Sequence, residues 1–333
     1  MWRKLKNIWN APHRWRLMLE LLLKRAKWVP DKLFLSLCYW LKFRKPMNWR
    51  NPQGYNEKLQ WLKLYDRRPE YSQMVCKYEA KKDIAKQVGE QYVIPALGVW
   101  ERAEEINFDG LPDRFVLKTT HDSGTVLICK DKSLFDLQAA VKVLNKSLSR
   151  NYFYQNREWP YKTIKPRIIA EPYLADNPKC SDAGKMPANS ALQAKFGLLD
   201  YKFMCFGGEV KLLFLDIGVV GNSWGHASEY YRSIFDRDFH QMPFCETRAH
   251  YPGPIEKPEC FDEMVCLAEK LSKGIPHLRV DMYYIDGQIK IGELTFFHGS
   301  GLTNCFDPES WNDTLGSWIQ LPEPTTKKRN QSI

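Results

Sequence analysis

The chain has 333 residues, of which 44% are hydrophobic and 26% charged, so it can build one large or two smaller packed lobes and is not disordered in bulk. Its net charge of +10 is unevenly spread. Residues 1–50 carry 13 Lys or Arg against two acids, Glu20 and Asp31, and the rest of the chain is close to neutral. Because the basic charge is confined to one end, we do not expect a nucleic-acid partner.

No apolar run approaches the roughly 18 residues needed to span a bilayer, and the N-terminus lacks the cleavage site of a signal peptide. The longest run, Leu33 to Leu41, is about half that length. The nine cysteines are scattered, with no CxxC and no zinc-ligand spacing. The sequence therefore predicts a reduced, cytoplasmic protein that neither spans a membrane nor is secreted.

Residues 1–45 are predicted to be helical, basic and amphipathic, with five tryptophans interleaved among the cations. Such a segment is typical of helices that lie on an anionic membrane, here the inner face of the plasma membrane. It is equally compatible with a helical arm that packs on its own domain with its cations in water. The sequence leaves both interpretations open.

Beyond a break at Pro46, Pro52 and Gly54, helical and strand patterns alternate irregularly. Helices are predicted at residues 57–65, 75–88, 133–149 (capped by Ser133) and 260–274, and strands at 92–100, 115–120, 121–128 and 167–174. Two further hairpins are expected, turned by Gly207-Gly208 and by Asp286-Gly287. Residues 176–194 resemble a loop, and the tail after Pro322 is polar. The fold class expected is α+β.

The strongest chemical signal is a pair of acids, Asp281 and Glu293, on the two strands of the last hairpin. With a two-residue turn, Asp281 would pair with Gly292, and Glu293 would point to the opposite face of the sheet. A bulge or a longer turn would bring both acids to one side. Flanked by Arg279, two carboxylates on one face could hold a hard cation such as Mg²⁺, with Thr295 on the same face as Glu293.

A second signal is the segment FVLKTTHDSGTVLI, which places Lys118 at the end of an apolar strand. A polar turn containing Gly124 follows, and then a returning strand. Backbone amides of such a turn, together with a lysine, can offset the charge of a triphosphate. Neither a Walker loop nor a dinucleotide-binding glycine motif occurs in the chain.

These segments resemble the TupA-like ATP-grasp family of polysaccharide gene clusters. The resemblance rests on an ordered series that runs from about residue 46 to residue 320. Its members are NPQGYNEKLQWLKLYDRRP (51–69), CKYEAKKDIAKQVG (76–89), FVLKTTHDSG (115–124), REWPYKTIKPRIIAEPYL (157–174), DYKFMCFGGEV (200–210) and RVDMYYIDGQIKIGELTFFHGSG (279–301). The resemblance implies an ATP-grasp fold, in which two α+β lobes clasp ATP. Residues 1–45 would precede this domain as a basic arm, and residues 321–333 would follow it as a tail.

The resemblance also implies a role for each matching residue. Lys77 and Lys118 would contact the ATP phosphates beneath a lid formed by His121, Ser123, Gly124 and Thr125. Glu171, Tyr173 and Leu174 would bind adenine, and Asp176 the ribose. Lys202 would be a further phosphate contact, and Arg279 would stabilise the phosphoryl group as it moves. Asp281, Glu293 and Thr295 would bind Mg²⁺.

Three positions depart from the family pattern. Thr295 stands where such enzymes usually have Asn, Cys76 where an Asp commonly precedes the first lysine, and His298 where Pro is expected. A hydroxyl is a poorer cation ligand than an amide carbonyl, so the number of magnesium ions, one or two, is left open.

The implied activity is ATP-dependent ligation of a carboxylate to an amine through an acyl phosphate. In this family the acceptor would be a carboxylated sugar or polysaccharide such as a uronic acid, and the donor an amino acid or amino alcohol. Two alternatives remain. A glycosyltransferase could use Asp236 and Asp238 of a DxD motif to hold a metal and a nucleotide sugar. Alternatively, the protein could be a non-catalytic, membrane-associated scaffold, in which the loss of the expected Asn at Thr295 would be tolerated.

Overall fold

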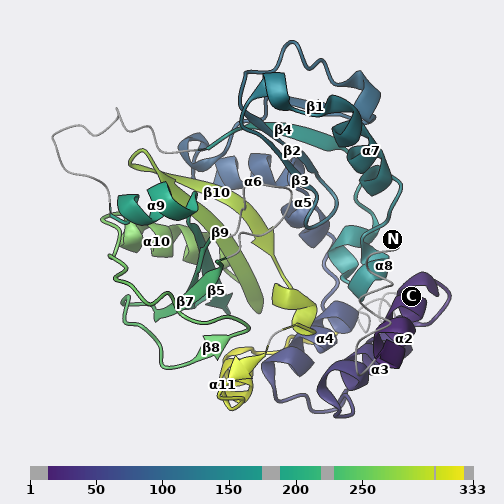
Figure 1. Ribbon diagram of the computed structural model, residues 1–333. Coiled ribbons are helices and arrows are strands. Elements are labelled where there is room, and N and C mark those ends of the chain that lie inside the picture. Colours follow the sequence, from purple (N-terminus) through teal and green to yellow (C-terminus); the bar gives the residue numbers. More distant parts are fainter. Residues whose placement is uncertain (1–13, 175–187, 219–228, 304, 326–333) are drawn as a thin grey trace.

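The computed structural model describes residues 14–174, 188–218, 229–303 and 305–325. Within them the chain builds two lobes, each around its own antiparallel sheet, with helices packed alongside (Figure 1). Mixed helices and antiparallel strands confirm the α+β class expected from the sequence. In the part of the chain that is described, no helix is both long and apolar enough to cross a membrane.

The smaller lobe contains a four-stranded sheet in the order β1-β4-β2-β3. Its strands are β1 (Gly98–Trp100), β2 (Phe115–Thr119), β3 (Val126–Cys129) and β4 (Ile168–Pro172). Helix α7 (Leu137–Leu148) packs on this sheet through Ala140 and Leu144, which are fully buried among the side chains of β2 and β4. The last residues of β2 and the turn after it therefore sit on a firmly packed base.

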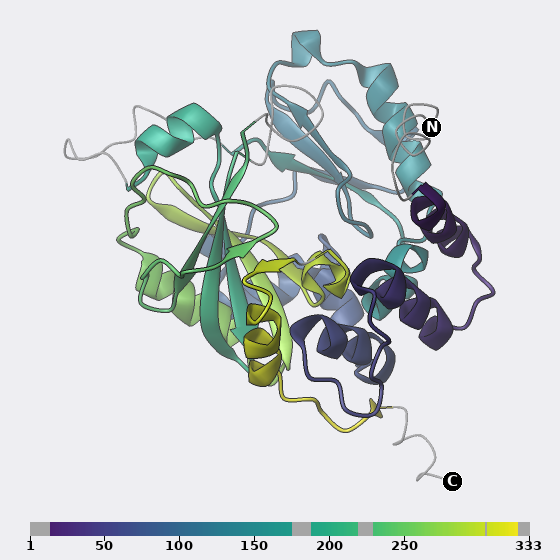
Figure 2. The ribbon, with the colours of Figure 1, turned by 60° about the horizontal axis from the view of Figure 1, so that its bottom comes forward.

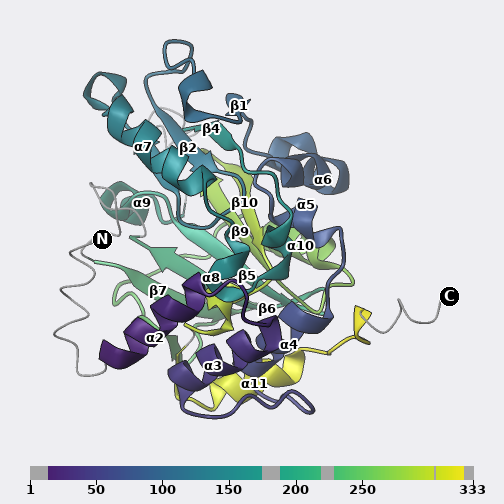
Figure 3. The same cartoon turned by 90° about the vertical axis from the view of Figure 1, so that its right-hand side faces the viewer.

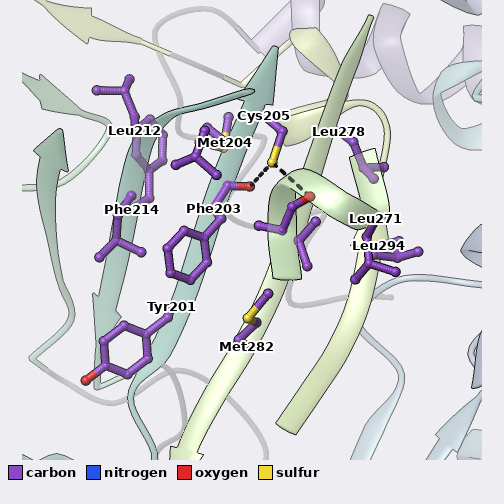
Figure 4. Packing of buried hydrophobic residues seen from close by; sticks show 14 of the residues in the cluster. Tyr201, Phe203, Met204, Cys205, Leu212, Phe214, Leu271, Leu278, Met282 and Leu294 are labelled. Atoms are coloured by element: carbon purple, nitrogen blue, oxygen red, sulfur yellow. Dashed lines mark hydrogen bonds between the residues drawn. The ribbon is translucent and has the colours of Figure 1, made fainter. Parts of the chain in front are cut away.

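The larger lobe contains a five-stranded sheet in the order β10-β9-β5-β6-β7. Its strands are β5 (Asp200–Phe206), β6 (Glu209–Ile217), β7 (Tyr231–Asp236), β9 (His277–Ile285) and β10 (Gln288–Thr295). Helix α10 (Phe261–Ser272) covers one face, and Phe203, Cys205 and Leu271 lie in the core between them (Figure 4). The Cys205 thiol donates weak hydrogen bonds to the carbonyls of Phe203 and Ala268 (Figure 4). A two-stranded ribbon of β8 (Cys245–Glu246) and β11 (Phe306–Asp307) lies beyond the edge strand β7.

Both hairpins predicted at glycine turns are confirmed, since β5 and β6 flank Gly207-Gly208, and β9 and β10 flank Asp286-Gly287. Other boundaries differ. The segment 75–88 divides into α5 (Tyr71–Val75) and α6 (Glu79–Val88), and the segment 92–100 keeps strand geometry only in β1, after the short 3-10 helix η1 (Glu90–Tyr92). Helix α7 is capped by the Asp136 carboxylate, which accepts a hydrogen bond from the Ala139 amide, so Ser133 is not the cap.

The remaining elements connect or extend the lobes. They are α4 (Tyr55–Tyr65), α8 (Phe153–Asn156), α9 (Ser190–Phe196), α11 (Trp311–Trp318) and the 3-10 helices η2 (Ala103–Glu105), η3 (Lys132–Leu134), η4 (Trp159–Lys162) and η6 (His298–Gly301). Helix α4 packs on α11 and η6, close to the last strands of the larger lobe.

The basic N-terminal arm contains α2 (Arg14–Arg25) and α3 (Asp31–Phe43), which lie beside α8 and α4 at the outer edge of the molecule (Figure 2). The arm packs on its own chain, because Phe34 and Leu35 are fully buried in a cluster that also includes Leu64 and Leu302. The fully buried Arg157 guanidinium donates to the carbonyls of Ala26 and Val29 and fixes the turn between the two helices. Residues 1–13 of the predicted arm lie outside the described residues.

Candidate functional site

Asp281 and Glu293 face each other across strands β9 and β10. The register runs regularly from the Asp286-Gly287 turn to the pair Ile291 and Met282, and then shifts so that Glu293, not Gly292, pairs with Asp281. The bulge is at Gly292, where an added Cβ would lie 2.7 Å from the Tyr283 ring. Of the two registers that the sequence left open, the bulged one occurs, and it brings both acids to one face.

A row of charged side chains continues from these acids across the sheet. Lys202 on β5 pairs in register with Asp281, and its ammonium group lies 3.4 Å from the Asp281 carboxylate and 3.6 Å from Asp216 on β6. Lys202 also forms a short ion pair with Asp200, two residues earlier on the same face of β5. Three adjacent strands thus place their charges together in the interior of the protein.

Arg279 bridges the two acids of the last hairpin. Its Nε and Nη2 donate to the two Asp281 oxygens at 2.6 Å each, and Nη2 also donates to Glu293 Oε1 at 2.9 Å. Arg279 Nη1 contacts His298 Nδ1 at 2.9 Å, and Thr295 Oγ1 lies 3.5 Å from Glu293 Oε1. The predicted residues therefore form one group, in which the guanidinium links the two acids. They are Arg279, Asp281, Glu293 and Thr295.

The ion-pair network has more carboxylates than cations. Asp216 pairs with Arg232 at 2.6 Å, and Arg232 pairs in turn with Glu246. Its members are five carboxylates (Asp200, Asp216, Glu246, Asp281 and Glu293) and three cations (Lys202, Arg232 and Arg279), which gives a formal charge of −2. Buried Asp200 Oδ1 has no hydrogen-bond partner in the described part of the chain. An excess of buried carboxylates with an unpaired oxygen is a donor set that fits a hard divalent cation.

The acids of the network have opposite pKa shifts. Burial alone would raise the pKa of Asp281, but the adjacent Arg279 and Lys202 hold it below its ordinary value. Burial, together with the negative charges of Asp281 and Asp216, raises the pKa of Asp200 to about 6 in spite of its pairing with Lys202. Near neutral pH the network is therefore mostly ionised.

A group of lysines gathers around Glu171 on β4 of the smaller lobe, and one of them comes from α6, which packs in the core of the larger lobe through Ala80 and Ile84. Lys118 from β2 and Lys81 from α6 each lie 2.6 Å from one oxygen of this buried carboxylate. Lys77 lies between α5 and α6, and its ammonium group donates to the carbonyl of Asp122 in the turn after β2. Both oxygens of the Glu171 side chain are thus paired with lysines.

One pocket joins the two groups of charges. Its lining includes Lys77 and Lys81 from the segment around α6 and Gly292 and Glu293 from β10. Ala80, Ile84, Val93 and Ile291 make the rest of its wall largely apolar. A wall of this kind, with a few charged groups converging on it, is characteristic of small-ligand sites.

The turn predicted as a phosphate lid is held internally. The Asp122 carboxylate accepts hydrogen bonds from Thr119, Thr125 and Ser147, and His121 Nε2 contacts the carbonyls of Ser147 and Arg150. The imidazole of His121 is therefore buried against the C-terminal end of α7, and it is not among the residues that line the pocket. Ser123 and Gly124 are exposed at the tip, and an added Cβ at Gly124 would meet no atom within 4 Å.

Two predicted hinge residues, Tyr173 and Leu174, follow β4 and are half-buried, with the Arg114 guanidinium 4.5 Å from the centre of the Tyr173 ring. Asp176 lies outside the described residues.

Sequence reasoning missed Lys81, Asp200, Asp216 and Arg232. The sequence could have indicated Lys81, because it lies four residues, about one helical turn, after Lys77. It could not have indicated the partners on neighbouring strands, because the pairing of β5, β6 and β7 joins residues far apart in the chain.

The loop after Thr295 is held in place by α4. Lys63, which is fully buried, donates to Gln60 Oε1, to the Asn156 carbonyl and to the Ser300 carbonyl. Burial lowers its pKa to about 8. These bonds fix the η6 turn and so position His298 against Arg279. The segment 51–69, the first of those that carry the family resemblance, therefore has a structural role.

The DxD motif of the glycosyltransferase alternative lies in a tight turn after β7. Asp236 Oδ1 accepts hydrogen bonds from the amides of Asp238 and His240, and Oδ2 lies 3.1 Å from His240 Nδ1. Asp238 and His240 are exposed. The ligand atoms of Asp236, Asp238 and His240 lie within 4.8 Å of one another, so the turn could hold a metal ion. The contacts of Asp236 are nevertheless those of a turn-forming aspartate, which explain its position without a ligand.

Comparison with known proteins gives a family match and several distant structural similarities. No curated protein matches the chain. The D-cycloserine synthetase DcsG is 13% identical over 80% of this chain and 71% of its own (TM-score 0.36), and a D-alanine–D-alanine ligase from Bacillus anthracis complexed with ATP is 15% identical over 74% and 58% (TM-score 0.36). The ATP-grasp ligase PsnB is 11% identical over 76% and 64% (TM-score 0.36).

The family match is extensive and agrees with the resemblance seen in the sequence. It covers residues 57–320, from the first turn of α4 to just beyond the last helix, α11. All residues of the charged network and of the lysine group lie within this range. Both lobes described above lie inside it. The chain therefore belongs to the family described as TupA-like ATPgrasp and has the ATP-grasp fold.

Proposed function

We propose that this protein is an ATP-dependent carboxylate–amine ligase. The observation that carries the proposal is the pocket in which Lys77 and Lys81, from the segment around α6, meet Glu293 on β10, beside a network with an excess of carboxylates. Lys81 also pairs with Glu171 of the smaller lobe. Lysines offset the charge of a polyphosphate, and the carboxylates would hold the magnesium ion that accompanies it. Membership of an ATP-grasp family makes ATP the expected nucleotide.

Asp281 and Glu293 would hold Mg²⁺, and Asp200 would be a nearby third acid. When bound, the ion would supply neutralisation of charge on the phosphate oxygens. In the described conformation Arg279 occupies both oxygens of Asp281 and one of Glu293. Nucleotide binding must therefore move this guanidinium off the acids, and the freed Arg279 can then turn toward the phosphoryl group that is transferred.

The chain's own residues serve a reaction in two steps. An oxygen of the acceptor carboxylate attacks the γ-phosphorus of ATP, the bond to the β,γ-bridging oxygen breaks, and an acyl phosphate and ADP are formed. The amine then attacks the acyl carbon, loses a proton and expels inorganic phosphate, which leaves an amide. Lys77, Lys118 and Lys202 would bind and orient the phosphates, and Arg279 would stabilise the charge on the group in transit. The turn at 121–125 would exclude water from the acyl phosphate.

The proposed acceptor is a carboxylated sugar or polysaccharide, such as a uronic acid residue, and the proposed amine is an amino acid or amino alcohol. This choice rests on the family resemblance of the sequence motifs. ATP consumption would place the protein in the cytoplasm.

The first test is thermal stabilisation by ATP, with and without Mg²⁺, of the wild-type protein and of Glu293→Gln. Ligand binding to the native state raises the melting temperature, by an amount set by the ratio of ligand concentration to Kd. We expect a Mg²⁺-dependent rise for the wild type and none for the variant. The matched control is Glu209→Gln, an exposed acid at the other end of the same sheet.

A turnover assay completes the test, since phosphate release from ATP should require both a uronic acid and an amine. No shift with ATP, but a shift with a nucleotide sugar that Asp236→Ala removes, would instead support the glycosyltransferase alternative. An ATP shift without turnover on any acceptor and amine would support the non-catalytic scaffold.

A further inference from the structure

Helix α2 exposes an apolar stripe to solvent. Trp15, Met18, Leu19 and Leu22 are exposed and follow the spacing i, i+3, i+4, i+7, which places them on one face of the helix. Leu23, four residues after Leu19 and so at the edge of the same face, is buried in the arm cluster. In a helix that is buried on one side, the side chains exposed to solvent are normally polar. Helix α2 instead exposes a leucine-rich face, in which Leu22 is 58% exposed.

Helix α3 extends the same surface. Leu33 and Trp40, seven residues apart, are 51% and 42% exposed, and Trp28 in the connecting turn is 84% exposed. The Arg44 guanidinium lies 5.4 Å from the ring centre of Trp15 and 5.0 Å from that of Trp40, so the two helices present their tryptophans side by side. Of the twelve large apolar side chains exposed in the described residues, eight lie between Trp15 and Trp40. We refer to this surface of α2, α3 and their turn as the arm face.

Exposed cations without a carboxylate partner among the described residues flank the arm face. Arg25, Lys27, Lys32, Lys42 and Arg44 are all exposed. The two acids of the region are already engaged, because Glu20 pairs with Lys24 at 2.6 Å and Asp31 pairs with Arg67 at 2.9 Å and with Arg157 at 3.2 Å. The arm face therefore combines exposed leucine and tryptophan with a positive charge that its own residues do not neutralise.

The arm face is held rigidly on the domain. Arg157 is fully buried, stacks 4.3 Å from the centre of the Phe34 ring and bonds the backbone of the α2–α3 turn. Leu302, four residues after His298, packs in the same cluster as Phe34 and Leu35. Figure 3 shows both helices along one outer side of the molecule, next to α8 and α4. The face is thus presented as a fixed surface, coupled by packing to the loop that carries His298.

We propose that the arm face docks on an anionic lipid surface. Apolar residues on one side of a helix enter the boundary between headgroups and acyl chains, tryptophan is favoured at that depth, and the surrounding cations are attracted to anionic headgroups. A second copy of the chain fits less well, since two arm faces would bring like charges together. This inference does not depend on the proposed ligase activity.

The test is co-sedimentation of the full chain with vesicles of phosphatidylcholine alone and of phosphatidylcholine with 30% phosphatidylglycerol. Wild-type protein should bind the anionic vesicles at least about tenfold more tightly, and binding should weaken as salt is raised. The variant Leu19→Glu/Leu22→Glu should lose most of this binding. Its control is Leu134→Glu/Leu137→Glu on the smaller lobe, where Leu134 is 82% exposed, and this control should bind as the wild type does.

A second pair of variants separates charge from apolar contact. Arg25→Gln/Lys27→Gln/Lys32→Gln should lower the partition coefficient by about fivefold for each cation removed. The control Lys130→Gln/Lys142→Gln/Lys146→Gln removes the same charge from exposed positions of the other lobe and should have no such effect. Melting temperatures close to wild type for all four variants show that folding is intact.

Three outcomes would overturn the proposal. Equal binding to neutral and anionic vesicles would remove the role of the cations, and unchanged binding by Leu19→Glu/Leu22→Glu would remove the role of α2. A dimer in light scattering that dissociates in Leu19→Glu/Leu22→Glu, without vesicle binding by the wild type, would assign the arm face to a second copy of the chain.

Discussion

Glu293 pairs with Asp281 because Gly292 forms a bulge between them. Without this extra residue in β10, Gly292 would face Asp281 and the Glu293 carboxylate would point to the other side of the sheet. Arg279 contacts both acids, and Lys202 meets Asp281 from the neighbouring strand. One glycine thus assembles the acidic half of the candidate site.

Replacing Gly292 should damage both stability and the site. A Cβ at this position would lie 2.7 Å from the Tyr283 ring, so Gly292→Ala must displace the ring or the bulge. We expect a loss of about 1–3 kcal/mol in the free energy of unfolding, measured by urea titration, together with loss of Mg²⁺-dependent stabilisation by ATP. Removing the ring in Gly292→Ala/Tyr283→Ala should recover nucleotide binding relative to Gly292→Ala. Full stability and binding in Gly292→Ala would show that the bulge is not needed.

Thr295 provides a gain-of-function prediction. Its hydroxyl lies 3.5 Å from Glu293 Oε1, on the face that carries the acids. An amide carbonyl is a better ligand for Mg²⁺ than a hydroxyl, so Thr295→Asn should lower the Mg²⁺ concentration for half-maximal ATP binding by about threefold to tenfold. Thr295→Val, which has the same shape as the wild-type side chain but no oxygen, is the control. If Thr295→Asn and Thr295→Val behave alike, this position does not contact the cation.

Lys118 and Lys81 share the Glu171 carboxylate, and their roles can be separated by kinetics. Each ammonium group lies 2.6 Å from one oxygen, so removal of either leaves Glu171 with a single cation. A lysine that also contacts a phosphate should matter most for the nucleotide, and Lys118→Met should raise KM for ATP by about tenfold or more. Lys130→Met, an exposed lysine just after β3, is the control. An unchanged KM in Lys118→Met would limit this lysine to a structural role.

His277 should make the protein sensitive to acid. Its Nδ1 lies 2.8 Å from the Phe296 carbonyl and its Nε2 lies 3.0 Å from the Tyr55 hydroxyl, so the buried ring is neutral, with the proton on Nδ1 and Nε2 as the acceptor. Burial lowers its pKa to about 3, whereas an unfolded histidine titrates near 6.5. Between these values the unfolded state binds more protons, so stability falls as pH falls, by at most about 1.4 kcal/mol per pH unit from this group.

The comparison of His277→Gln with the wild type isolates this contribution from that of the carboxylates. Urea unfolding between pH 6.5 and pH 4 should show a shallower loss of stability in the variant, even if the variant is less stable at pH 7. His240→Gln, at an exposed position, should keep the wild-type slope. Equal slopes for wild type and His277→Gln would mean that this imidazole does not govern the acid response.

Several features were determined by the sequence alone, because they depend on neighbouring residues. The hairpins at Gly207-Gly208 and Asp286-Gly287 form where the sequence predicts them, since a positive φ at these glycines is a local requirement. The ordered motifs that identify the family are likewise readable along the chain. The assignment of Lys77, Lys118, Arg279, Asp281 and Glu293 to one nucleotide site remains a prediction, although the structure brings Lys77 and Glu293 to one pocket.

Tertiary structure decided what depends on residues far apart in the chain. The register of β10 was open until the bulge at Gly292 selected one face for both acids, and the partners Asp216 and Arg232 emerged only when β5, β6 and β7 lay side by side. The arm packs on its domain and still exposes leucine and tryptophan, a combination that helical periodicity cannot predict. Periodicity reveals that a helix has an apolar side; only packing determines which side is covered.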